Sequence, residues 1–109
     1  ATATGLREPV ARALVSKGIG LGRLERSEEA IVAYEEVVRR FGDAKEAELL
    51  QAVARALVNK GIRLSRLERS KDAIAVYDEV LRRFGKATET EFRAQVAIAT
   101  QNRASVVDR

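Results

Sequence analysis

The chain of 109 residues contains no Cys, His, Met or Trp, and only one Pro. Without Cys or His, the chain has no disulfide, no thiolate or imidazole zinc site, no cysteine nucleophile and no histidine acid–base catalyst. No apolar run approaches the roughly 20 residues that span a bilayer, and no signal peptide is visible. Because aromatic residues make up only 5% and charged residues 33%, we expect an all-helical protein with an aliphatic core. The lack of Cys is compatible with the cytoplasmic location that we expect.

The net charge is +4 and the isoelectric point about 9.8, yet the basic residues are dispersed. Lys and Arg never run beyond adjacent pairs, and acidic residues lie among them. A nucleic-acid-binding protein usually concentrates its positive charge on one face or in one run. The pairs at 39–40 and 82–83 fall at the ends of expected helices, where cations complement the helix dipole. We therefore expect no nucleic-acid partner, and binding through the Arg-rich ends remains only an alternative.

A stretch of about 43 residues occurs twice in the chain. Residues 10–19 read VARALVSKGI, and residues 53–62 read VARALVNKGI. The string RLERS at 23–27 returns at 66–70, again displaced by 43 residues and without insertion or deletion. A fixed period of this size is typical of a repeat architecture, in which each unit needs a neighbour to bury its apolar face.

Apolar residues at three- and four-residue spacing predict five helices in this pattern. Ser27 is suited to be the N-cap of the second helix, and Gly42 and Gly85 are suited to the C′ positions that end the second and fourth helices. The expected helices cover residues 9 to 22 or 23, 27–41, 43 or 44 to about 66, 70–84, and about 88–107. These helices divide the chain into an N-terminal segment at 1–8, disordered or left over from expression, a first repeat at 9–43, a second repeat at 44–86 and a capping helix at 87–109.

The last helix reads as a third copy of the first half of the repeat. Three positions of the third helix change in the fifth: Leu57, Gly61 and Leu64 correspond to Thr100, Ala104 and Val107, so both leucines become smaller or more polar residues. These positions should face the place where a sixth helix would lie. Such a change is what a solvent-facing cap requires.

The repeat resembles the tetratricopeptide repeat. The family pattern of Leu and Gly on the first helix and Ala-x3-aromatic on the second is matched in the first copy by Leu14, Gly18, Leu21, Ala30 and Tyr34. Three features depart from that pattern. The period is 43 rather than 34, the turns contain Glu25 and Glu68 where the family often has Gly, and Gly42 and Gly85 stand in place of the closing Pro. The resemblance implies an α-α superhelix of antiparallel helix pairs, with two full repeats and a C-terminal capping helix.

The resemblance also implies a protein–protein interaction module without catalytic activity, cofactor or metal. Proteins of this family generally bind an extended peptide or a helix in a concave groove lined by the first helices. The groove positions that carry over are Arg12, Val15, Ser16, Ile19 and Arg23 on the first helix, Arg55, Val58, Asn59, Ile62 and Arg66 on the third, and Ile98, Gln101, Asn102 and Ser105 on the fifth.

Two alternatives remain open for the polar groove positions. Ser16, Asn59 and Asn102 either form a ladder that hydrogen-bonds a bound peptide or are ordinary exposed polar residues. The four Arg side chains either bind an acidic ligand or pair with neighbours such as Glu25 and Glu68. The aliphatic residues at 15, 19, 58 and 62 predict an apolar groove floor, which suits an amphipathic helical partner.

Adjacent carboxylates on the second helices do not predict an enzyme. Glu28-Glu29, Glu35-Glu36 and Asp78-Glu79 are sequence neighbours, and neighbours on a helix point about 100° apart. The competing hypothesis is a structural one, in which the chain forms homo-oligomers or belongs to a longer array.

Overall fold

The computed structural model describes residues 3–108. Five helices occupy these residues, and no strand is found among them. The helices are α1 (Ala3–Arg23), α2 (Ser27–Phe41), α3 (Ala47–Arg66), α4 (Ser70–Phe84) and α5 (Thr90–Val107). The expected all-helical class and the number of helices are therefore confirmed.

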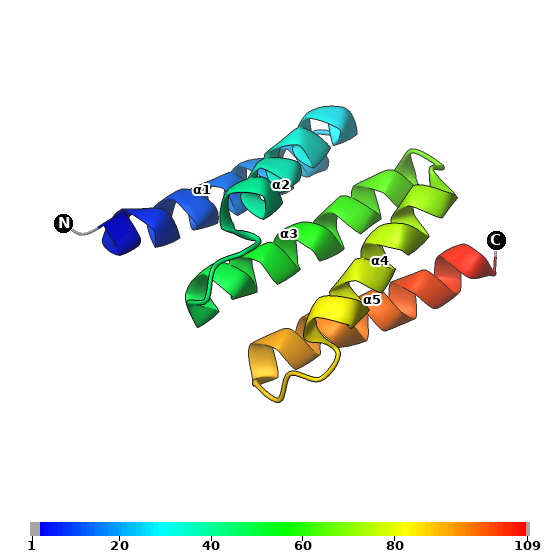
Figure 1. Ribbon diagram of the computed structural model, residues 1–109. Helices are drawn as coiled ribbons and strands as arrows, with labels where there is room; N and C mark the ends of the chain where they lie inside the picture. The colour runs from blue at the N-terminus through cyan, green and yellow to red at the C-terminus, as the bar shows by residue number, and fades with distance from the viewer. Residues whose placement is uncertain (1–2, 109) are drawn as a thin grey trace.

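The helices form two layers. Figure 1 shows α1, α3 and α5 running side by side in one direction, with α2 and α4 in front of them. We call α1, α3 and α5 the first helices, and α2 and α4 the second helices. Each second helix packs against the first helix before it and the first helix after it, and α3 also contacts both α1 and α5. The described chain measures 48 × 32 × 18 Å, so its smallest dimension is close to two layers of helices about 10 Å in diameter.

The first helix begins earlier than the sequence predicts. Its first residue is Ala3, so residues 3–8 are helical and Pro9 lies inside the helix, which corrects the expectation of a disordered segment there; residues 1–2 lie outside the described part. The Arg7 guanidinium lies 5.7 Å from the centre of the Phe41 ring, and its Nη1 lies 3.7 Å from the Glu46 carboxylate. These contacts hold the added turn against the end of α2 and the start of α3.

The turns inside the two helix pairs have the same geometry. Glu25 and Glu68 have φ angles of 59° and 60°, in the left-handed region. The N–H after each glutamate donates to the carbonyl five residues earlier, from Arg26 to Leu21 and from Arg69 to Leu64, both at 2.9 Å. This 6→1 bond and the left-handed residue before its donor are the features of a Schellman motif, which usually places glycine at that residue. Each helix pair therefore turns at a glutamate, although a residue with a Cβ atom disfavours the left-handed conformation.

Gly42 and Gly85 directly follow the second helices, as the sequence predicts. They are C-cap residues with right-handed φ angles of −60° and −61°, and not the C′ residues that were expected. The chain leaves the helix direction only a few residues later, where Glu46 and Glu89 are extended, with ψ angles of 130° and 137°. Because an extended residue cannot lie inside a helix, α3 begins at Ala47 and α5 at Thr90, later than predicted.

The N-cap assignment is also shifted by one residue. Ser27 is the first residue of α2 and is buried, whereas Arg26 occupies the N-cap position without a side-chain capping bond. The Arg26 carbonyl accepts the first helical bond, from Ala30 at 3.0 Å. The end of the Schellman turn is therefore also the start of the next helix, which leaves no separate capping residue.

The core is built around two tyrosines that lie against two glycines. A Cβ atom on Gly18 would lie 2.3 Å from the Tyr34 ring, and one on Gly61 would lie 2.4 Å from the Tyr77 ring. Both rings are buried, and burial raises the pKa of the Tyr34 hydroxyl above its usual value. The close approach of the paired helices therefore depends on glycine at 18 and 61, as the sequence predicts.

Candidate functional site

The three first helices together line one cleft. It has a volume of about 580 Å³ and lies near the N-terminal ends of these helices. Since α1 and α5 both line it, and both contact α3 but not each other, α3 forms the floor and the outer helices form the walls. We call it the three-helix cleft; its lining residues are Glu8, Arg12, Val15, Ser16, Glu48, Gln51, Ala52, Arg55, Thr90, Glu91, Ala94 and Gln95.

The charged groups of the three-helix cleft have both signs. Arg12 and Arg55 contribute two guanidinium groups, and Glu8, Glu48 and Glu91 contribute three carboxylates. All five residues except Glu8 are exposed, and Glu8 is half-buried. Within residues 3–108 neither arginine forms an ion pair. The pairing of the groove arginines with Glu25 or Glu68, one of the two alternatives, is therefore not found in the described part of the chain.

The predicted groove positions are divided between two hollows. Arg12, Val15, Ser16 and Arg55 line the three-helix cleft. A smaller hollow of about 160 Å³ near the C-terminal ends of α3 and α5 is lined by four others: Ile62, Arg66, Asn102 and Ser105. The remaining predicted positions line neither hollow: Ile19, Arg23, Val58, Asn59, Ile98 and Gln101. Eight of the fourteen predicted groove positions thus line one of these two hollows.

The aliphatic positions mainly pack between helices. Val15 and Val58 are buried, and Ile19 and Ile62 are half-buried against the core. Only Val15 contributes to the surface of the three-helix cleft, where the other side chains are mostly polar. Val15 is therefore the only one of these four residues that could form an apolar floor of this cleft, because the others pack into or against the core away from it.

The structure does not gather the Ser16, Asn59 and Asn102 side chains in one hollow. Ser16 lines the three-helix cleft and Asn102 lines the smaller hollow. The Asn59 amide nitrogen donates a hydrogen bond to the Arg55 carbonyl in its own helix, at 2.8 Å. This bond leaves Asn59 with less donor capacity for a ligand, because an amide nitrogen has only two hydrogens.

Sequence reasoning missed the carboxylates of the cleft. Glu48 and Glu91 occupy equivalent positions, 43 residues apart, on α3 and α5. The period contains that signal, since residues at this offset lie on the same side of parallel first helices. The two glutamates make the cleft a site of mixed charge, in contrast to the basic groove that the arginines alone predict.

Most acidic residues of the second helices lie in ion pairs. Glu35 pairs with Lys60 at 3.1 Å and Asp78 with Arg103 at 2.6 Å, each across to the following first helix. Glu36 and Glu79 pair with arginines one turn later in their own helices. The hydrogen bonds from these arginines hold the pKa of each glutamate below its usual value. These carboxylates stay charged and structural, so they do not form an acid–base pair suited to catalysis.

Within residues 3–108 no group of three or more acidic side chains is placed to hold a metal ion. None of the helices there combines the length and the apolar character needed to cross a bilayer.

Comparison with known proteins gives no family assignment. No protein-family model matches the chain, and neither a curated protein nor a solved structure matches it. The interpretation of function therefore depends on the geometry of the described residues.

Proposed function

We propose that the protein is a protein–protein interaction module that binds a peptide or helix of a partner in the three-helix cleft. The observation that carries this proposal is a hollow of about 580 Å³ built jointly by three helices that are distant in sequence. Clefts of this size, with a few convergent polar groups, are the usual location of binding sites.

The charges of the cleft indicate what the partner carries. Arg12 and Arg55 are exposed and lack internal ion partners in the described chain, whereas Lys60 and Arg103 on the opposite side of the first helices are paired. A guanidinium group binds a carboxylate through two parallel hydrogen bonds, and the three glutamates favour a cation. The partner segment therefore carries both acidic and basic residues, rather than being uniformly acidic.

The arrangement of helices supports a tetratricopeptide-like α-α superhelix as part of the same proposal. Two antiparallel helix pairs and a fifth helix stack in order, with first helices in one layer and second helices in the other (Figure 1). The same proposal places the protein in the cytoplasm, with which its lack of Cys is compatible.

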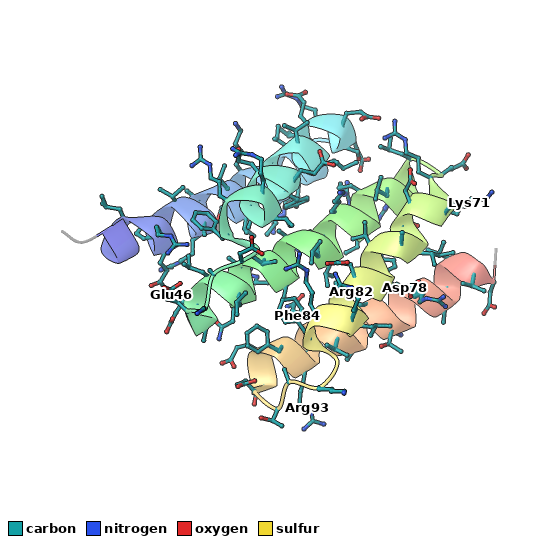
Figure 2. All side chains as sticks on the ribbon, viewed as in Figure 1. Glu46, Lys71, Asp78, Arg82, Phe84 and Arg93 are labelled. Atoms are coloured by element: carbon teal, nitrogen blue, oxygen red, sulfur yellow. The ribbon has the colours of Figure 1, made fainter. Side chains whose placement is uncertain are left out.

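The experiment is affinity capture from the source lysate with the chain immobilised, followed by mass spectrometry. Arg12→Glu and Arg55→Glu should each remove the specific partner, since either change places a carboxylate opposite the partner's acidic residue. Arg93→Glu is the matched control, because Arg93 is also exposed and also on a first helix (Figure 2) but does not line the cleft.

Two further measurements make the result decisive. Circular dichroism and thermal melting should be unchanged in all three variants, because each arginine is exposed and unpaired in the described structure. Capture of the same proteins by the wild type, both cleft variants and the control variant would contradict the proposal.

A further inference from the structure

Each first helix has one side that faces the preceding part of the chain. On α3 this side is a stripe at three- and four-residue spacing, formed by Leu49, Val53, Ala56, Lys60 and Arg63. The three aliphatic residues are buried. We call this stripe, and its counterparts displaced by 43 residues, the leading face of a first helix.

The leading faces of α3 and α5 are both covered by the second helix before them. On α3, Lys60 pairs with Glu35 of α2 at 3.1 Å. On α5, the equivalent Arg103 pairs with Asp78 of α4 at 2.6 Å. An acidic residue of the covering helix thus meets a cation of the leading face at both junctions.

The second junction also shows how the start of the leading face is covered. The leading face of α5 comprises Phe92, Val96, Ala99, Arg103 and Val106. The rings of Phe84 and Phe92 stack with centres 5.1 Å apart and planes 5° from parallel. Figure 2 shows Phe84 at the end of α4, beside the start of α5, and Asp78 earlier in α4. The covering helix therefore presents an acid and, six residues later, an aromatic ring.

The leading face of α1 has the same chemistry, but no helix within residues 3–108 covers it. Its residues are Leu6, Val10, Ala13, Lys17 and Gly20. Leu6 is 60% exposed where Leu49 is 2% exposed, and Val10 is 38% exposed where Val53 is fully buried. Lys17 is exposed and forms no ion pair within the described residues, whereas its two equivalents are paired. An apolar stripe that includes a cation is therefore open on α1; Lys17 interacts electrostatically with Glu29 of α2 but forms no ion pair with it.

The open face at the other end of the molecule differs. On α5 the side that would face a sixth helix contains Ala97, Thr100, Gln101 and Ala104, which are all exposed. The equivalent residues of α3 are Ala54, Leu57, Val58 and Gly61, and all are buried. Two large aliphatic residues are thus replaced by polar ones where α5 meets solvent. The leading face of α1 has no such replacement, so it retains the chemistry of a buried surface.

We propose that the leading face of α1 is a docking surface for an amphipathic helix of a partner, which runs antiparallel to α1 and carries an acidic residue opposite Lys17. The α2–α3 and α4–α5 contacts indicate what such a helix needs. In each contact the leading face packs against a helix that has an acidic residue followed by an aromatic residue. The site lies apart from the three-helix cleft, because none of its five residues lines that cleft.

The test supplies such a helix to the full chain. A second copy of residues 27–46 is joined directly before residue 4, so that its linker enters α1 as 42–46 enters α3. Docking should raise the melting temperature by at least about 4 °C and slow hydrogen exchange in residues 6–20. A graft that leaves both unchanged would overturn the proposal.

Three substitutions locate the effect. Val10→Glu should abolish the gain from the graft while leaving the ungrafted chain unchanged. Ala104→Glu, on the open side of α5, is the matched control and should preserve the gain. Arg55→Glu should preserve it too, so a failure of the cleft proposal and a failure of this one are distinguishable.

The charge rule is tested by reversal. Lys17→Glu should reduce the gain in melting temperature, and Glu35→Lys in the grafted copy should restore it; the lack of any restoration would contradict the assignment of the acid to Lys17. Sedimentation of the ungrafted chain tests whether a second copy of the chain covers the leading face of α1 instead. A dimer that Val10→Glu dissociates would show that a second copy covers the face, and would overturn the proposal of a separate helix.

Discussion

The helix pairs α1–α2 and α3–α4 have almost the same sequence but different surroundings. Residues 10–19 and 53–62 differ only at one position, Ser16 against Asn59. Yet α3 is packed on both sides, by α2 and α4, whereas α1 is packed only by helices that come after it in the chain, α2 and α3. The difference teaches that one stripe of residues is core in one helix and surface in the other, depending only on whether a helix precedes it.

The largest effect should come from truncating the start of the leading face. Leu49→Ala should lower the free energy of unfolding by about 2–5 kcal/mol, since it leaves a cavity in the core. Leu6→Ala, the same change one period earlier, should alter it by less than about 0.5 kcal/mol because Leu6 is exposed. Urea unfolding followed by circular dichroism measures both. Equal losses would mean that Leu6 is covered in the free chain.

The next effect concerns the glycines under the tyrosines. Gly61→Ala should destabilise the protein by about 1–3 kcal/mol, because the new methyl group overlaps the buried Tyr77 ring. Gly18→Ala should cost less, although its overlap with Tyr34 is equally close, because α1 has no neighbour on its leading face and can move away.

The control for this pair is Gly20→Ala. No atom lies within 4 Å of the added Cβ there, so the better helix propensity of Ala should stabilise the protein by about 1 kcal/mol. Thermal melting of the three variants ranks their effects on stability. A higher melting temperature for Gly61→Ala would contradict the close approach of α3 and α4.

A smaller effect should be equal in the two pairs. Glu25→Gly and Glu68→Gly should each stabilise the protein by about 1 kcal/mol, because glycine adopts a positive φ angle without a steric cost. The two turns have the same geometry and depend on local bonds, so their surroundings matter little. Chemical denaturation of the single and double variants should show additive gains. If only one of the two substitutions stabilised the protein, the stability of the turns would depend on their surroundings.

The smallest effect is the pH dependence of the glutamates on the second helices. The Arg82 and Arg83 hydrogen bonds lower the folded pKa of Glu79 below its ordinary 4.5. A lowered folded pKa stabilises the protein above the unfolded pKa, and this contribution is lost as the pH falls from about 4.5 through the folded value. Glu79→Gln should therefore cost less than about 1 kcal/mol at pH 7.

Glu36 offers the comparison in the first pair. Its pKa is also lowered, chiefly by the hydrogen bond from Arg39, so Glu36→Gln should show a loss of the same sign that disappears in the same acidic range. The measurement is the difference in unfolding free energy between each variant and the wild type from pH 7 to pH 3. A difference that persists at pH 3 would indicate a packing role for the side chain instead of a charge effect.

The sequence predicts most of the fold because its signals are local. The positions of Ser27, Phe41, Ser70 and Phe84 bound α2 and α4 as expected. The errors lie where distant contacts or backbone conformation decide. Arg7 meets Phe41 and Glu46 across the molecule, which no local pattern reveals. The left-handed conformation falls on Glu25, whose side chain does not favour it.

The candidate site was predicted less well than the fold. Arg12, Ser16 and Arg55 line a hollow, and their role in binding stays a prediction; Val58 is buried, and Glu48, which also lines the hollow, was overlooked. A helical period tells which residues share a side. Whether that side forms a wall, a floor or a contact with another helix depends on the distance and angle of the neighbouring helices.

By itself, the sequence determined the repeat, the helix pairs and the small residues at Gly18 and Gly61, since helical periodicity and turn chemistry act over a few residues. The tertiary structure alone decided which side of each first helix is buried. Val10 and Val53 stand in the same local sequence, and only Val53 has a helix over it. Burial is a property of the neighbours a residue meets in space, and within residues 3–108 the repeated sequence meets different neighbours in α1 than in α3.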